Sequence, residues 1–183
     1  MPRERSDTKT EIRAVALELF GRKGYEKTSL REIAERLDIT KAALYYHYRS
    51  KDELLQAMVR PLLDDAEELL GAYSGGGVDP RALLGDHFDL CVRHSTLLLA
   101  LLNDLGSLGE SGLVDRIVEW RRGLDVALVG EEPETPARMG AVVALGGIQD
   151  IAVLVAPGDA ERHREAAVEI ALAALDAGLS YMD

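Results

Sequence analysis

The sequence predicts an all-α protein of about nine helices, in which a head of three short helices is followed by a longer helical body. Apolar residues recur at spacings of three and four through most of the chain, the period of an α-helix with one buried face. Residues that cap helices stand where these periodic stretches begin. Neither an alternating apolar–polar pattern nor a hairpin turn is found in the sequence, so we expect no β-strand.

The three helices of the head are expected within the first fifty residues. Residues 7–22 are amphipathic, and a capping box at residues 29–32 predicts that a second helix begins there. Thr40 is placed to cap a third helix over residues 41–47. Asp38 can take the turn conformation between the second and third helices.

The body is predicted to begin with a long fourth helix that contains Pro61. A second capping box, at residues 50–53, opens this helix, and the run Ser74–Gly77 is the clearest linker in the chain. Asp79-Pro80 and Thr135-Pro136 each combine an N-cap residue with a proline at the first helical position. Pro157-Gly158-Asp159 separates the last two helices. We therefore divide the chain into a head, residues 1–50, and a body, residues 51–183.

Composition and charge narrow the class of protein. Of the 183 residues, 47% are hydrophobic and 29% charged, which is typical of a globular protein. The single cysteine excludes an internal disulfide framework. No apolar segment like that of a signal sequence follows the N-terminus, and the longest clean apolar run, residues 97–102, is far too short to span a bilayer. We expect a cytoplasmic protein with no membrane partner.

The net charge of −11 is unevenly distributed along the chain. Residues 1–60 hold 13 Lys and Arg against 10 Asp and Glu, a balance of +3. Residues 61–183 hold 8 against 22, a balance of −14. A mildly basic head on a strongly acidic body can approach a polyanion such as DNA with the head alone.

The third helix has the side chains of a helix that enters a DNA groove. Leu44 can anchor it to the core, whereas its other residues are small, hydroxylated, cationic or polar aromatic, as close approach to bases and phosphates requires. Tyr48 is expected in the core. Tyr45 and Tyr46 cannot both face inward beside Leu44, although the alternative that they are half-buried core residues stays open.

Residues 12–58 resemble the TetR family of bacterial transcriptional regulators. The resemblance rests on the combination Ile12, Ala16, Leu19-Phe20, Gly24-Tyr25, Thr28-Ser29-Leu30-Arg31-Glu32-Ile33-Ala34, Ile39-Thr40-Lys41, Leu44-Tyr45-Tyr46-His47-Tyr48 and Lys51-Asp52-Glu53-Leu54-Leu55. It implies that a helix-turn-helix head binds an operator in double-stranded DNA. The family often has glycine at the position of Asp38 and Gly-Thr at that of Ala42-Ala43, so apolar contact with a thymine methyl becomes more plausible here.

The resemblance also implies a role for ten positions of the head. Phosphate contacts are implied at the start of the second helix, where free backbone N–H groups favour an anion, and at the start of the fourth. The groove-facing positions are Thr40, Lys41, Ala42, Ala43, Tyr45, Tyr46 and His47, and the phosphate-contacting positions are Thr28, Ser29 and Lys51.

A second candidate site lies in the body. His87, Cys91 and His94 are spaced to share one helix face, which Leu98 extends, and they could line a ligand pocket. A metal site or plain core packing are the alternatives, and no bound metal or cofactor is predicted. Trp120 and Gln149 could add a platform and a hydrogen-bonding group, although a lone tryptophan is more often a packing residue.

Residues 136–156 and 160–179, the last two helices, are rich in small and branched residues. Helices with so much apolar surface need a second layer, and the resemblance implies that they pair with those of a second copy as a four-helix bundle. The alternative is a core within one chain.

The leading hypothesis is therefore a homodimeric repressor that binds a palindromic operator and is released by a small, mostly apolar effector. A constitutive repressor without a ligand is the nearest alternative. From different classes, a helical adaptor or an enzyme without DNA binding remain possible. No nucleophile elbow, phosphate-binding glycine loop or paired carboxylates favour the enzyme, so we expect none.

Overall fold

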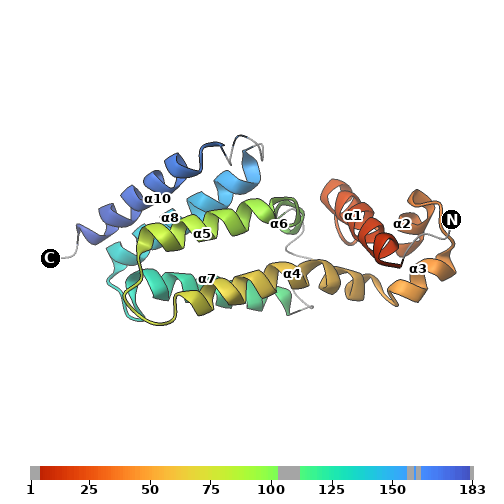
Figure 1. Cartoon of the computed structure of the whole chain (residues 1–183), viewed down its shortest axis with the longest axis horizontal. Coiled ribbons are helices and arrows are strands. Elements are labelled where there is room, and N and C mark those ends of the chain that lie inside the picture. Colours follow the sequence, from red (N-terminus) through yellow and green to blue (C-terminus); the bar gives the residue numbers. More distant parts are fainter. Residues whose placement is uncertain (1–4, 103–111, 156–158, 160–161, 182–183) are drawn as a thin grey trace. The chain divides into compact units, whose positions relative to one another are not determined.

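The computed structural model describes residues 5–102, 112–155, 159 and 162–181. This part of the chain is all α-helical and contains no strand, as predicted (Figure 1). Its nine helices are α1 (Arg5–Lys23), α2 (Leu30–Arg36), α3 (Lys41–His47), α4 (Lys51–Ala72), α5 (Pro80–Arg93), α6 (Ser95–Leu102), α7 (Leu113–Val129), α8 (Thr135–Leu154) and α10 (Arg164–Leu179).

The helices form two compact units. The first comprises residues 1–61 and 96–114, and the second comprises residues 62–95 and 115–183. Helix α4 contributes to both, because it runs on through Pro61. This division follows packing, whereas the predicted division at residue 50 concerns function and stays a prediction.

The capping signals of the first unit form as predicted. Ser29 Oγ accepts a hydrogen bond from the backbone N–H of Glu32, and Thr40 Oγ1 accepts one from that of Ala43. Asp38 has φ of 52°, the left-handed conformation that ends α2 and turns the chain towards α3. Apolar residues of all three helices form the core: Ile12, Ala16, Leu19 and Phe20 of α1, Leu30, Ile33 and Ala34 of α2, and Leu44 of α3.

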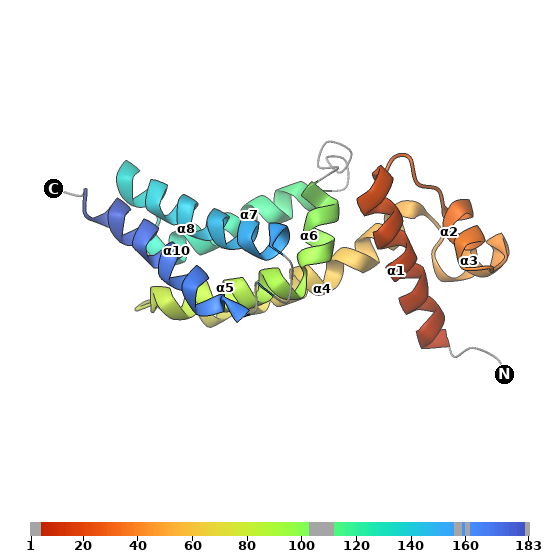
Figure 2. The same ribbon diagram turned by 90° about the horizontal axis from the view of Figure 1, so that it is seen from above.

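In the second unit, α8 packs against both α5 and α10, and α10 also packs against α5. Helices α8 and α10 lie side by side in both views (Figures 1 and 2). Their backbones meet at two glycines. A Cβ atom on Gly178 would stand 2.5 Å from the carbonyl oxygen of Pro136 and 2.9 Å from Cα of Gly140. The glycines at these positions therefore allow close packing of α8 against α10 within one chain.

Ion pairs hold α10 to α5. The Arg164 guanidinium donates to both carboxylate oxygens of Asp89, at 2.7 and 2.8 Å. It passes over Gly85, where a Cβ atom would stand only 2.6 Å from Arg164 Nη2. Arg81 pairs with Glu165 and Glu169 from the other direction. These contacts fix the orientation of α10 about its own axis. They therefore determine which face of α10 stays uncovered.

The ends of α8 differ from the prediction by a few residues. Its N-cap is Glu134 and Thr135 is already helical, because the Glu134 carbonyl accepts the first helical bond from Arg138 N–H. The expectation that Thr135 caps this helix was wrong by one position. The helix ends at Leu154, and Pro157 and Gly158, predicted to separate the last two helices, lie outside the described residues.

Among the described helices, α8 is long and apolar enough to cross a membrane, with a mean hydropathy of 1.4. This is weak support for a membrane segment, because a core helix of a soluble protein meets the same test. Residues buried on one side of α8, among them Ala141, Leu145 and Ile148, belong to the core of the second unit.

Candidate functional site

Helix α3 presents one polar face to solvent and one apolar face to the core. Leu44 is fully buried and Tyr48, just beyond the helix, is 4% exposed, so the prediction that Tyr48 belongs to the core is confirmed. Tyr45 and Tyr46 are 41% and 66% exposed. Lys41 and Ala42, four residues earlier on the same side of the helix, are exposed as well. These four residues form the outer face of α3: Lys41, Ala42, Tyr45 and Tyr46.

The side chains of this outer face support one another. Lys41 Nζ lies 5.3 Å from the centre of the Tyr45 ring, a cation–π distance. The Tyr46 and His47 rings meet edge to face with their centres 5.4 Å apart. Ala43 and His47 are half-buried beside them and Thr40, the exposed N-cap, stands at the end of the helix. The face thus combines one cation, two phenol groups and small residues.

The start of α4 is tied to the loop between α1 and α2 by Lys51. Its ammonium group donates to the carbonyl oxygens of Tyr25, at 2.8 Å, and Glu26, at 3.3 Å. It also lies 4.1 Å from the centre of the Tyr25 ring. Lys51 therefore has a structural role that sequence reasoning did not assign to it, and the phosphate contact implied there stays a prediction.

Of the two residues implied at the start of α2, only Ser29 is exposed. Thr28 is 2% exposed, its hydroxyl donates to the Gly24 carbonyl at 2.9 Å, and its N–H donates to the Tyr25 carbonyl. A phosphate contact at either position stays a prediction, and Ser29 is the better placed. Two exposed cations of this unit, Lys27 and Arg49, were not singled out in the sequence, and the surplus of positive charge in the head was their only signal.

In the second unit, three of the predicted pocket residues come together. His87 and Cys91 are fully buried, and Cys91 Sγ lies 3.7 Å from His87 Nε2 and 3.8 Å from His87 Nδ1. The His87 ring meets the Trp120 ring edge to face at 5.6 Å. Because the Leu145 carbonyl can only accept, His87 Nε2, 3.3 Å away, carries the hydrogen. The residues thus form an enclosed polar cluster, and a role in binding a ligand stays a prediction.

The other three predicted pocket residues do not belong to this cluster. Helix α5 ends at Arg93, and His94 turns to Asp65, with 2.8 Å between Nε2 and Oδ2. Together with Arg93, it lowers the pKa of the Asp65 carboxyl through hydrogen bonds. Leu98 is buried in α6, in the other compact unit, and Gln149 is half-buried on α8. In the described residues, no group of three potential metal ligands gathers.

Helix α7 adds further polar groups, of which Arg121 and Asp125 were not singled out in the sequence. Arg121 Nη2 donates to the Val142 carbonyl of α8 at 3.0 Å, while its Nε lies 3.8 Å from Asp125 Oδ1, too far for a hydrogen bond. Three buried polar atoms of α7 have no hydrogen-bond partner: Trp120 Nε1, Arg121 Nε and Asp125 Oδ1. Such atoms are rare in folded proteins and call for an explanation.

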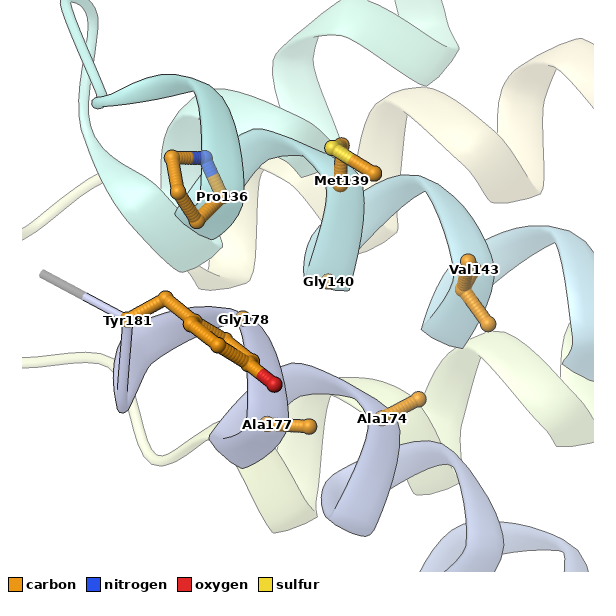
Figure 3. A pocket seen from close by; sticks show the side chains of 8 residues that line it. All are labelled: Pro136, Met139, Gly140, Val143, Ala174, Ala177, Gly178 and Tyr181. Atoms are coloured by element: carbon orange, nitrogen blue, oxygen red, sulfur yellow. The ribbon is translucent and has the colours of Figure 1, made fainter.

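An open groove runs between α8 and α10. Its volume is about 580 Å³ and no charged side chain lines it. Figure 3 shows the α8 residues on one side and the α10 residues with Tyr181 on the other. The lining residues are Pro136, Met139, Gly140, Val143, Ala174, Ala177, Gly178 and Tyr181. Val143 is 60% exposed, and Ile170, on an uncovered part of α10, is 65% exposed.

Burial of His87 predicts a loss of stability in mild acid. Loss of solvation and the nearby Arg121 charge lower its pKa from 6.5 to about 4. As the pH falls below 6.5, the unfolded chain binds a proton at this histidine that the folded protein does not bind. The free energy of unfolding therefore decreases between pH 6.5 and about 4. We expect a loss of about 2 kcal/mol from pH 7 to pH 5.

Urea unfolding at both pH values, with His87→Gln beside the wild type, measures this loss. His87→Gln should abolish the loss of about 2 kcal/mol in the free energy of unfolding. His163→Gln, at an exposed histidine, should retain this loss. An identical pH dependence in the wild type and His87→Gln would show that this residue is not the source.

The head has the architecture of a helix-turn-helix DNA-binding domain, and comparisons with known proteins agree. Residues 12–58 match the family described as "Bacterial regulatory proteins, tetR family". The HTH-type transcriptional repressor KstR2 of Rhodococcus jostii is 35% identical over 83 residues, which are 44% of this chain and 39% of that protein. The HTH-type transcriptional regulator TtgR of Pseudomonas putida is 35% identical over 103 residues, 56% of this chain and 44% of that protein.

In these residues the chain is similar to the TetR family of bacterial transcriptional regulators. The fold agrees over nearly the whole chain: the crystal structure of a TetR-like transcriptional regulator from Rhodococcus sp. RHA1 superposes with a TM-score of 0.70 at 23% identity, covering 98% of this chain and all of that one. Both named relatives are described as HTH-type transcriptional regulators or repressors. The sequence matches span only about two fifths of each relative's own length.

Proposed function

We propose that the protein is a transcriptional repressor that binds a palindromic operator as a homodimer, through α3 of each protomer, and is released by a small, mostly apolar effector. Such a protein works in the bacterial cytoplasm, at the nucleoid. The observation that carries the proposal is the outer face of α3, whose cation and phenol groups are exposed while Leu44 fixes the helix to the core.

DNA binding explains why this face is exposed. Tyrosine hydroxyls and a lysine ammonium can bond base edges and phosphate oxygens, and the alanine methyl of Ala42 can contact a thymine methyl. Burying the phenol rings of Tyr45 and Tyr46 in the protein would have stabilised an adaptor with no DNA partner. Their exposure favours the repressor over the adaptor. No specific observation on the described residues favours the adaptor.

The uncovered faces of α8 and α10 favour a dimer. Exposed apolar side chains at the groove, with no charge among its lining residues, mark a surface that another protein covers. A two-fold axis would bring the same face of a second copy against it, because such an interface is self-complementary. Helices α8 and α10 of both copies then form a four-helix bundle. This arrangement agrees with the predicted use of residues 136–156 and 160–179.

An effector is favoured by the buried polar atoms of α7 without partners, since a bound molecule could satisfy them. A constitutive repressor would have to leave them unsatisfied or hydrate them. Operator affinity measured with and without candidate effectors distinguishes the two.

Replacing Tyr46, the more exposed of the two tyrosines of α3, tests the DNA-binding proposal. Tyr46→Ala should weaken binding to a fragment of the protein's own promoter by about 5- to 150-fold if the residue reads a base. Binding to random DNA should change little. Tyr46→Phe removes only the hydroxyl and should also weaken operator binding if that hydroxyl bonds the base. Fluorescence anisotropy titrations at two salt concentrations measure both affinities.

Lys51→Ala should instead weaken operator and random DNA about equally and reduce the salt slope by about 1, if the ammonium group neutralises a phosphate. Unchanged binding after Tyr46→Ala, Lys41→Ala and Lys51→Ala would remove α3 and the start of α4 from the DNA interface. Binding that does not weaken with salt would contradict DNA recognition altogether.

A further inference from the structure

A cavity of about 250 Å³ lies where α7 ends and α8 begins. Gly130, with φ of 85°, ends α7 in the left-handed conformation, and its N–H donates to the Val126 carbonyl at 2.8 Å. The residues that follow this turn line the cavity together with the last two turns of α7. All of the lining residues fall within residues 122–138, so the cavity shares no residue with the cluster of His87 and Cys91 and none with α4.

Four charged residues line this cavity without pairing with one another. Arg122 and Arg138 supply two positive charges, and Asp125 and Glu131 supply two negative ones. Loss of solvation raises the pKa of the Asp125 carboxyl, and the charges of Arg121 and Arg138 oppose this shift, so Arg138 is near that carboxyl. Within the described part of the chain, Asp125 has its ion pair with Arg121, and no ion pair joins Arg122 or Arg138 to an acid. Opposite charges that share a cavity without pairing leave room for a molecule that carries both charges.

One of these charged groups is a buried acceptor that lacks a donor. Asp125 Oδ1 is buried and has no hydrogen-bond partner. Arg121 Nε lies 3.8 Å away, too far for a hydrogen bond, and the same guanidinium already donates to the Val142 carbonyl. Because an ionised carboxylate can only accept, the missing group is a donor. An ammonium group would donate a charge-assisted hydrogen bond and would balance the negative charge as well.

We propose that this cavity binds a free α-amino acid with a small apolar side chain. The ammonium group of the ligand donates to Asp125, and its carboxylate accepts from the guanidinium groups of Arg122 and Arg138. The inference goes beyond the proposed function and does not depend on it, because binding of an amino acid can be measured without DNA.

Volume and lining define the class of amino acid. At about 30 Å³ for each water-sized group, 250 Å³ holds about eight non-hydrogen atoms, as many as valine has. Val126, Val129 and Pro133 supply apolar surface for the side chain of the ligand. An acidic side chain is disfavoured by the charge of Glu131, and lysine or arginine exceeds the volume.

Isothermal titration calorimetry of the full chain with L-valine measures the binding. We expect saturation with a dissociation constant of about 10 µM to 1 mM, the range for a ligand of this size. Two analogues each lack one charged group: 3-methylbutanoate lacks the ammonium group and isobutylamine lacks the carboxylate. Each should bind at least about tenfold more weakly, because it forgoes the charge-assisted bonds of that group. Absence of saturable binding of L-valine, or an equal affinity for either analogue, would overturn the proposal.

Two variants assign the binding to this cavity. Asp125→Asn keeps the shape of the side chain but removes its charge, so the preference for L-valine over 3-methylbutanoate should disappear. Arg138→Gln alters an exposed side chain that makes no ion pair, and it should lower the affinity for L-valine at least about tenfold. Arg162→Gln, at an exposed arginine outside the cavity, is the control and should bind like the wild type. Unchanged affinity for L-valine in both cavity variants would overturn the assignment.

Urea unfolding gives a second measurement that does not depend on the heat of binding. A ligand that binds the folded cavity and not the unfolded chain must stabilise the fold. Saturating L-valine should therefore raise the urea midpoint of the wild type and of Arg162→Gln, and should raise that of Arg138→Gln much less. The same series without ligand shows that each variant is folded. A wild-type midpoint that does not move, or one that moves equally in Arg138→Gln, would overturn the proposal.

Discussion

Val143→Glu is expected to convert the protein to a monomer and to lower operator affinity by about 10²- to 10⁴-fold. The side chain is 60% exposed in one chain and lines the apolar groove between α8 and α10. In the proposed dimer it is covered, and the two-fold axis buries the new carboxylate twice without a partner, at a cost of several kcal/mol. A monomer engages one half-site at a time, so the gain from linking two heads is lost.

Val118→Glu is the matched control for this prediction. Val118 is exposed to the same extent, 60%, but lies on α7 and does not line the groove. It should leave mass and operator affinity unchanged. Light scattering reports the mass and anisotropy titration the affinity. A Val143→Glu protein that stays dimeric with full affinity would place the interface on another face.

Gly178→Ala is expected to destabilise the protein by up to about 2 kcal/mol. The added methyl would overlap the Pro136 carbonyl and the backbone of Gly140, and backbone atoms cannot move aside as a side-chain tip can. Forcing the helices apart costs about 1–3 kcal/mol, and alanine gains roughly 1 kcal/mol over glycine within a helix, so the net loss reaches about 2 kcal/mol.

Urea unfolding at a fixed protein concentration measures the change, because stability of a dimer depends on concentration. Gly71→Ala, which meets no neighbour, should be neutral or slightly stabilising. Gly140→Ala should resemble Gly178→Ala, since each glycine occupies the space that a side chain on the other would need. Full stability of Gly178→Ala would contradict a backbone contact between α8 and α10.

Local signals in the sequence predicted the helices of the head well. Ser29 and Thr40 cap helices through bonds to residues three positions away, so a short stretch of sequence contains everything that forms them. Asp38 likewise takes its left-handed turn for local reasons. The cap of α8 was misplaced by one residue because any residue with an extended backbone can precede a helix, and Glu134 does so without a side-chain bond.

The second unit was less predictable because its contacts join distant residues. Helical spacing put His94 on the face of His87 and Cys91, but α5 ends at Arg93 and the last of the three turns to Asp65. Trp120 was singled out as an isolated residue, whereas its contact with His87 depends on how α7 packs. No sequence pattern specifies whether a buried donor will find an acceptor, because the acceptor comes from a distant part of the chain.

The bonds of Lys51 have a consequence for the thermodynamics of recognition. Its ammonium joins the start of α4 to the loop that leads into α2, and Thr28 closes the same loop with its own hydroxyl. The conformational entropy of this loop is therefore lost when the chain folds. The loop is therefore already ordered before the head binds any DNA. Binding then carries no further entropic cost for immobilising this backbone.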